Sequence, residues 1–156
     1  MTKIHLDTDI GGDMDDLCAL AMLLKWPDLE ITGVTTVSEE QGRRAYLPRL
    51  ARAGRLGELI VLQVERCARS EQNEHNYGET CPGLPRDIIN FQHDPLACAI
   101  ASGWQEGVEI ETVPLKMEIR ESWLYEIPNS DGIPTRLVTK IDGNAFNEFW
   151  CHILCR

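Results

Sequence analysis

The chain has 156 residues, a formal net charge of −10 and a hydrophobic fraction of 43%. This length suits a single domain over residues 1–156 that can bury a sizeable core. Nucleic acids and anionic membranes favour basic surfaces, so we expect neither as a partner of so acidic a protein. The first residues lack an apolar stretch of signal-peptide length, and no segment approaches the roughly 20 apolar residues of a membrane span, so we expect a cytoplasmic protein.

The first forty residues have the pattern of a βαβ unit. Residues 3–6 predict a short strand, and the apolar spacing from Leu17 onward predicts a helix that ends before Pro27. The β-branched residues of segment 30–37 predict a second strand. A strand, a helix and a strand in this order indicate two parallel neighbouring strands.

The middle of the chain is less regular. Residues 41–54 predict a helix that Pro48 would kink or shorten, and the apolar run 59–64 predicts a third strand. Residues 65–87 are polar, contain glycine and proline, and indicate a long loop.

The segment 93–103, HDPLACAIASG, has clear signals for both ends of a helix. Asp94 is the expected N-cap, Pro95 suits the first helical position, and Gly103 can close the C-terminus. Beyond it, apolar and polar residues alternate over 113–119, which is typical of a half-buried strand.

Residues 136–142 predict another strand, and NAFNEFWCHILC (144–155) predicts a closing helix. The fold class is therefore α/β, with an antiparallel extension near the C-terminus.

The six cysteines show no C-x-x-C spacing. Cys18 and Cys98 fall in apolar helical patterns and are expected to be small core residues with free thiols. The sequence CHILC (151–155) could hold a metal in principle, but a second ligand cluster is lacking in the sequence, which disfavours a closed site.

Five aspartates crowd into the ten positions 7–16, without a lysine or arginine among them. Two unit charges 4 Å apart repel by about 4 kcal/mol at an effective dielectric constant of 20. The side chains can relieve this repulsion by splaying into water, by holding protons or by binding a cation. Because the cluster follows a strand, at the end where open α/β sheets bind ligands, we favour a divalent cation.

Two other loop types compete with this interpretation. An EF-hand loop starting at Asp7 fails at its fifth position, Gly11, and at its twelfth, Cys18. A phosphatase of the haloacid dehalogenase type also begins with Asp-x-Asp after a strand, as Asp7 and Asp9 do. That family expects Thr or Val where Gly11 stands, so a phosphatase with Asp7 as nucleophile remains the runner-up.

Residues 7–20, DTDIGGDMDDLCAL, closely resemble the N-terminal signature of the inosine–uridine-preferring nucleoside hydrolases, in the variant with two additional residues before the final Asp pair. Segments 27–38, 93–101 and 140–154 are similar to later segments of that family. The resemblance implies an α/β fold with a mostly parallel sheet flanked by helices. The family's proteins are longer, and the absent central part corresponds to a deletion near 84–91. Strand edges exposed by this loss would favour a homo-oligomer.

The resemblance also assigns a Ca²⁺ site and the groups that act on water. Asp9 would be the general base and a Ca²⁺ ligand, and Asp16 and Asp94 would be further ligands. Ca²⁺ takes six to eight oxygen ligands, which suits a group of carboxylates.

The remaining assignments concern the substrate, a ribonucleoside. Asp15 would hold ribose hydroxyls, and Glu40 stands where the family has a substrate-binding Asn or Asp. His93 would donate a proton to the leaving base. Asp7 would support the neighbouring site residues.

The implied activity is Ca²⁺-dependent hydrolysis of the N-glycosidic bond of ribonucleosides, which gives free base and ribose. This reaction passes through an oxocarbenium-like state that nearby carboxylates stabilise. The alternative is a catalytically inactive remnant that acts as a metal-binding or interaction protein, because the absent central segment would grip the ribose.

Overall fold

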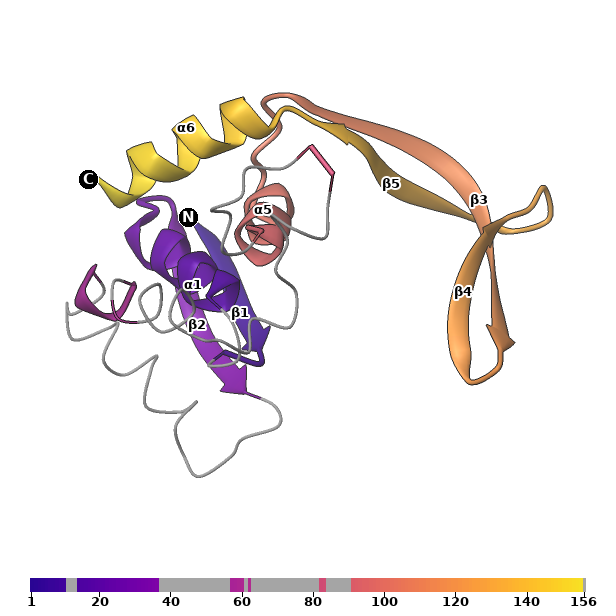
Figure 1. Ribbon diagram of the computed structural model, residues 1–156, viewed down its shortest axis with the longest axis horizontal. Coiled ribbons are helices and arrows are strands. Elements are labelled where there is room, and N and C mark those ends of the chain that lie inside the picture. Colours follow the sequence, from indigo (N-terminus) through magenta and orange to yellow (C-terminus); the bar gives the residue numbers. More distant parts are fainter. Residues whose placement is uncertain (11–13, 37–56, 61, 63–81, 84–90, 156) are drawn as a thin grey trace. The chain divides into compact units, whose positions relative to one another are not determined.

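The computed structural model describes residues 1–10, 14–36, 57–60, 62, 82–83 and 91–155. The fold is mixed α/β, with a small parallel sheet and a separate antiparallel sheet (Figure 1). The elements in chain order are β1 (Thr2–Thr8), α1 (Asp15–Lys25), β2 (Leu29–Thr36), α5 (His93–Ala101), β3 (Val108–Arg120), β4 (Trp123–Pro128), β5 (Ile133–Ile141) and α6 (Gly143–Leu154).

The chain divides into two compact units. The first comprises Met1–Trp104 with Phe149–Arg156, and the second comprises Gln105–Glu148. The single domain expected over residues 1–156 stays a prediction. No helix within the described ranges is both long enough and apolar enough to cross a membrane.

The first unit contains the predicted βαβ arrangement. Strands β1 and β2 are parallel neighbours, with Ile4 opposite Ile31 and Leu6 opposite Val34. Parallel strands need a crossover connection, which α1 supplies. The predictions of two strands and a helix over residues 3–37 are therefore confirmed as far as Thr36.

Helix α1 is the centre of the core of this unit. Its residues from Asp15 to Leu23 are all buried, including the two acidic residues of the first turn. Leu17 and Leu20 cluster with Ile10. Burial of each such aliphatic side chain contributes about 1.5–3 kcal/mol relative to exposure, so the position of α1 is well determined by packing.

One strand prediction is wrong. Residues 57–60 and 62 are helical rather than extended, and Leu59 belongs to the α1 core cluster. A short apolar run does not distinguish a buried strand from a buried helical turn, which explains the error. The helix predicted over 41–54 lies outside the described residues, as does the loop predicted over 65–87 except Pro82 and Gly83.

Helix α5 confirms the helix predicted from residue 93, but its N-terminus differs from the prediction. The N-cap position is Gln92, without a capping hydrogen bond from its side chain, and Asp94 lies inside the first turn. Asp94 is therefore not the N-cap. The predicted C-terminus is confirmed: Gly103 has a φ of 106° and its N–H donates to the carbonyl of Ile100 at 3.1 Å.

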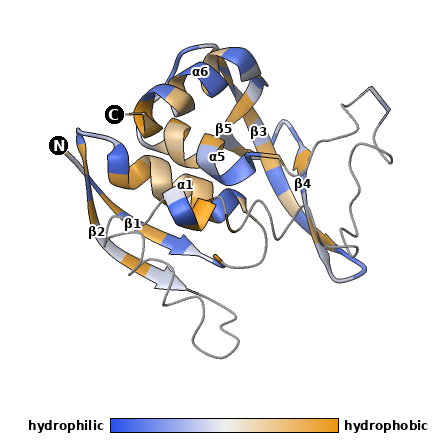
Figure 2. Cartoon of the chain, turned by 60° about the vertical axis from the view of Figure 1, so that its left-hand side comes forward, coloured by the Kyte–Doolittle hydropathy of each residue, from blue (hydrophilic) through white to orange (hydrophobic). Residues whose placement is uncertain are grey.

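The second unit contains the antiparallel sheet, in which β3 lies between β4 and β5. This sheet confirms the expected antiparallel extension, although β4 was not expected from the sequence. Hydrophobic and hydrophilic residues alternate along β3 and β5 (Figure 2). Leu115 is buried, but Met117 and Ile119 are 65% and 77% exposed, so the outer part of β3 is not the half-buried strand that the alternation predicts.

The predicted closing helix is confirmed as α6, and its C-terminal half belongs to the first unit. The ring of Phe149 lies 4.9 Å from that of Trp26, edge to face, and 5.7 Å from that of Trp104. The indole N–H of Trp150 donates to the carbonyl oxygen of Cys18 at 3.4 Å. The end of the chain is therefore tied to α1.

The environment of the cysteines predicts unequal reactivity. Cys18 is 1% exposed, and burial, together with the negative charge of Asp15, raises the pKa of its thiol to about 11. Cys151 is exposed on α6. We expect iodoacetamide to modify Cys151 rapidly in the native protein and to leave Cys18 intact, as peptide mass spectrometry would show. Both should react in guanidinium chloride. Equal native rates would contradict the burial of Cys18.

Candidate metal centre

The site begins at the C-terminal end of β1, where Asp7, Thr8 and Asp9 follow one another. Asp7 and Thr8 are the last two residues of the strand, Asp9 directly follows it, and all three line one cavity. The carboxylate of Asp7 accepts a hydrogen bond from the hydroxyl of Thr35 at 2.5 Å, which ties the end of β1 to β2.

Thr8 connects the strand to the helix. It is buried, and its hydroxyl donates a hydrogen bond to the carboxylate of Asp16 and accepts one from the N–H of Ile10 at 3.2 Å. The hydroxyl thereby holds the Asp16 side chain against the end of β1. Thr8 was not predicted as a site residue. No local pattern marked it, because the predicted strand covers residues 3–6 and its partner Asp16 lies eight residues further along the chain.

The acidic residues come from the first turns of two helices that contact each other. Asp15 and Asp16 begin α1, Asp94 lies in the first turn of α5, and the two helices are neighbours (Figure 1). A helix N-terminus carries about +0.5 of an elementary charge, which favours carboxylates there. One carboxylate oxygen from each of these three residues lies within 4.8 Å of the other two.

The carboxyl group of Asp16 lies in an environment that disfavours its ionisation. Burial, and then the negative charges of Asp94 and Asp9, raise the pKa of Asp16 from 3.8 to about 6, although the hydrogen bond from Thr8 acts in the opposite direction. The fold thus holds a carboxyl group in a place where ionisation is disfavoured unless positive charge is supplied.

The carboxylates surround a cavity of about 320 Å³. The described residues that line it are Leu6, Asp7, Thr8, Asp9, Asp16, Ala19, Asp94, Ala97 and Cys98. Lysine and arginine are absent from this set. We call this cavity, with Asp15 beside it, the carboxylate pocket. Its carboxylate and hydroxyl oxygens could hold a hard cation.

The structure brings together most of the predicted site residues. Asp7, Asp9, Asp16 and Asp94 all line the carboxylate pocket, although Asp94 is far from the others in the sequence. Asp15 belongs to the group of three carboxylates rather than to the lining.

The remaining predicted residues lie elsewhere. His93 is exposed, stacks on Phe91 with ring centroids 5.3 Å apart, and is not among the described lining residues. Glu40 lies outside the part of the chain that the structure describes. Of the candidate ligands in the C-terminal CHILC sequence, Cys151, His152 and Cys155 are all exposed.

Comparisons with protein-family models, with curated proteins and with solved structures give no match to this chain.

The raised pKa of Asp16 predicts the pH dependence of stability in the presence of a chelator. Because the folded state favours the protonated carboxyl, the free energy of unfolding should rise as the pH falls from above 6 toward 4, by at most about 3 kcal/mol. Asp16→Asn removes the charge but can still accept the hydrogen bond from Thr8. Thermal melts at pH 7 and pH 5 should show a more stable variant at pH 7 with a smaller pH response. An unchanged response would refute the assignment to Asp16.

Cation binding should stabilise the protein. Free Ca²⁺ at 100 times its Kd would raise the free energy of unfolding by about 2.7 kcal/mol. Each kcal/mol corresponds to about 2–4 °C in Tm for a chain of this size. Asp16→Asn and Asp94→Asn should abolish this increase because each removes a carboxylate of the pocket. Asp28→Asn is the matched control, since it removes the same charge from an exposed residue outside the pocket. An equal calcium response in all four proteins would place the cation elsewhere.

Proposed function

We propose that the carboxylate pocket binds Ca²⁺ and that the protein hydrolyses the N-glycosidic bond of ribonucleosides, which gives free base and ribose. The observation that carries the proposal is the convergence of Asp9, Asp16 and Asp94 on one pocket. These residues come from sequence segments that resemble two separate motifs of the inosine–uridine-preferring nucleoside hydrolases.

The residues present fit a calcium ion. Ca²⁺ binds six to eight oxygens, and Asp16 and Asp94 supply carboxylates close enough to share one cation. Asp9 lines the same pocket but is not in that close group. Asp15 lies within the same group. When bound, the ion supplies the positive charge that keeps these groups ionised and polarises a nearby water molecule.

Three aspartates have distinct tasks in the proposed reaction. Asp9, exposed at the end of β1, takes a proton from the attacking water as general base. Asp15 holds ribose hydroxyls, and Asp7, fixed by its hydrogen bond from Thr35, supports the position of Asp9. The negative charge of the pocket stabilises the oxocarbenium character that develops on the ribose ring.

His93 supplies the proton for the leaving base. It is the first residue of α5, directly before Asp94, so that the proton donor and a cation ligand belong to one helical turn. Its ring is exposed, and an imidazole is a common proton donor to a leaving group.

The proposed architecture is a shortened form of the family's mostly parallel sheet flanked by helices. The β1–β2 pair and the helices α1 and α5 supply the parallel part. Strand edges left by the absent central segment would pair in a homo-oligomer.

The second candidate function is a catalytically inactive protein that retains the cation site for metal binding or interaction. The position of His93 favours it, because this residue is not among the described residues that line the pocket. Such a protein would bind calcium normally and leave nucleosides intact.

Release of ribose from inosine, uridine and cytidine distinguishes the two functions. We expect Ca²⁺-dependent release that a chelator abolishes, and Asp9→Asn should lower kcat by about 10²–10⁴-fold, the usual contribution of a general base. Asp28→Asn should cleave like the unaltered protein. A folded, calcium-binding protein without ribose release would establish the inactive alternative. Cleavage that is lost in Asp7→Asn but kept in Asp9→Asn would move the catalytic role to Asp7.

A further inference from the structure

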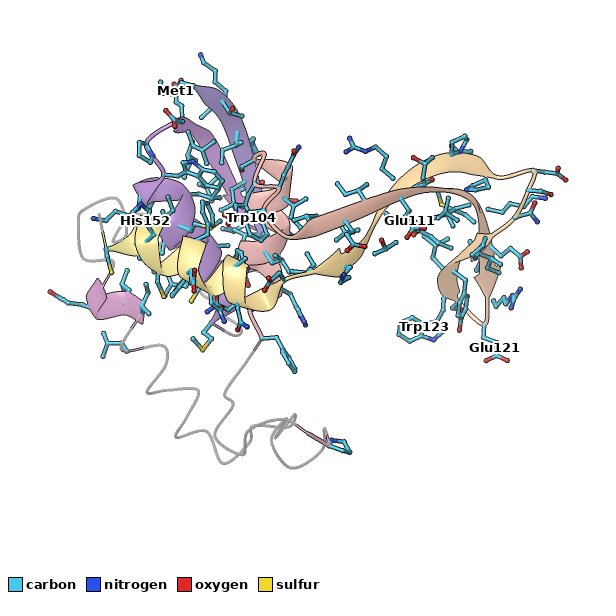
Figure 3. The ribbon with its side chains drawn as sticks, turned by 90° about the horizontal axis from the view of Figure 1, so that it is seen from above. Met1, Trp104, Glu111, Glu121, Trp123 and His152 are labelled. Carbon is cyan, nitrogen blue, oxygen red and sulfur yellow. The ribbon has the colours of Figure 1, made fainter. Side chains whose placement is uncertain are left out.

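A group of polar residues on β1 and β2 leads to the carboxylate pocket. The two strands lie side by side near the labelled Met1 (Figure 3), and their register pairs His5 with Gly33 and Asp7 with Thr35. Residues two apart in a strand project to the same side of a sheet, so these two cross-strand pairs are neighbours on one side. Asp7 lines the pocket, which places the second pair at its wall.

Two hydrogen bonds join these side chains into a network. The hydroxyl of Thr35 donates to the carboxylate of Asp7 at 2.5 Å, and Nε2 of His5 lies 3.2 Å from the same hydroxyl oxygen. A hydroxyl has one hydrogen, which Asp7 accepts here, so the Thr35 oxygen can only accept from the imidazole. His5 therefore donates through its Nε2–H, and each hydrogen bond polarises and strengthens the other.

Gly33 provides the space that the imidazole needs. A Cβ atom at this residue would lie 2.8 Å from Nδ1 and 3.0 Å from Cε1 of His5, so the ring would have to move. The backbone of Gly33 has no left-handed φ, so its conformation would accept another residue. Glycine weakens the interior of a strand and often marks a close approach of this kind. The position of the His5 ring is therefore the structural reason for glycine here.

Asp7 needs such a restraint because its side chain is exposed and shares the pocket with three other aspartates. An exposed carboxylate beside like charges lowers its electrostatic free energy by rotating away into water. The hydrogen bond from Thr35, strengthened by His5, opposes this rotation and favours the ionised form of the carboxyl group. The charge of Asp7 is thereby kept at the pocket wall, where it attracts a cation.

We propose that His5, Thr35 and Gly33 are positioning residues that increase the Ca²⁺ affinity of the carboxylate pocket through Asp7. Thr35 holds the carboxylate, His5 holds the hydroxyl of Thr35, and Gly33 leaves room for the imidazole. None of the three is among the described residues that line the pocket. This inference rests on the calcium site of the proposed function but is independent of the hydrolysis of nucleosides.

The Kd of Ca²⁺ tests the proposal, measured by isothermal titration calorimetry on the metal-free full chain. Thr35→Val should raise the Kd about tenfold, the lower end of the usual effect of partners outside a ligand set. Thr35→Ser keeps the hydroxyl and should retain the affinity of the unaltered protein. His5→Ala should raise the Kd by a smaller factor than Thr35→Val, because His5 acts through the hydroxyl.

Gly33→Ala tests the network without removing any hydrogen-bonding group. The added methyl group displaces the imidazole, so the Kd should rise by the same factor as in His5→Ala. The His5→Ala/Gly33→Ala double variant should have the Kd of His5→Ala alone, because the methyl group then has no ring to displace. Thr135→Val is the matched control: it removes a strand hydroxyl that donates to the carbonyl oxygen of Ile133, outside the described lining, and should leave the Kd unchanged.

The failure of this inference can be distinguished from the failure of the proposed function. An unchanged Kd in Thr35→Val or in His5→Ala, or an equal loss of affinity in Thr35→Ser and Thr35→Val, overturns the positioning role while the calcium site stands. An unaltered protein that binds no Ca²⁺ overturns the calcium site and this inference together. Calcium binding without ribose release overturns only the hydrolysis, and the positioning role is then still decided by the Kd values.

Discussion

The hydrogen bond from Thr8 to Asp16 is the interaction on which the candidate site depends. It joins the last residue of β1 to the first turn of α1, and the N–H of Ile10 adds a contact to the same hydroxyl. Ile10 is itself fully buried in the core cluster of α1. The packing of apolar side chains and the position of a buried carboxylate are thereby coupled, so the core sets the geometry of the site.

Two helix N-termini explain how so many carboxylates can be tolerated here. The first turns of α1 and α5 both supply acidic residues to the carboxylate pocket, and each N-terminus offers partial positive charge worth about 0.3–1 kcal/mol per carboxylate, or up to about 2 kcal/mol when partly buried. This falls short of the burial cost and mutual repulsion that raise the pKa of Asp16. A bound cation would offset the remaining unfavourable free energy of ionising these carboxyl groups. This is a physical reason to expect a metal site, and it does not depend on the family resemblance.

The sequence predicts the parts of this fold that rest on local patterns. Helical spacing from Leu17 and the β-branched residues of 30–37 predict the βαβ unit, and the helix-end signals of 93–103 predict α5. The approach of Asp94 to Asp16 follows the family resemblance. Strand β4 escaped prediction because Glu121 and Ser122, with φ of 51° and 69°, form its preceding turn without the glycine that usually marks one.

Other errors have a common origin in tertiary contacts. Asp94 has every local property of an N-cap, yet its carboxylate lies with those of Asp15 and Asp16, an arrangement that only the packing of α5 on α1 produces. Thr8 likewise has no local pattern of its own, because its partner lies eight residues further along the chain. Site residues that act through such long-range contacts can be identified only from the packed structure.

Helix α1 links the site to the closing helix. Its first turn supplies Asp15 and Asp16 to the group of carboxylates. The carbonyl oxygen of Cys18 in the same helix accepts the indole N–H of Trp150 and so fixes α6. One buried core element thus positions both the acidic residues and the helix that follows the antiparallel sheet.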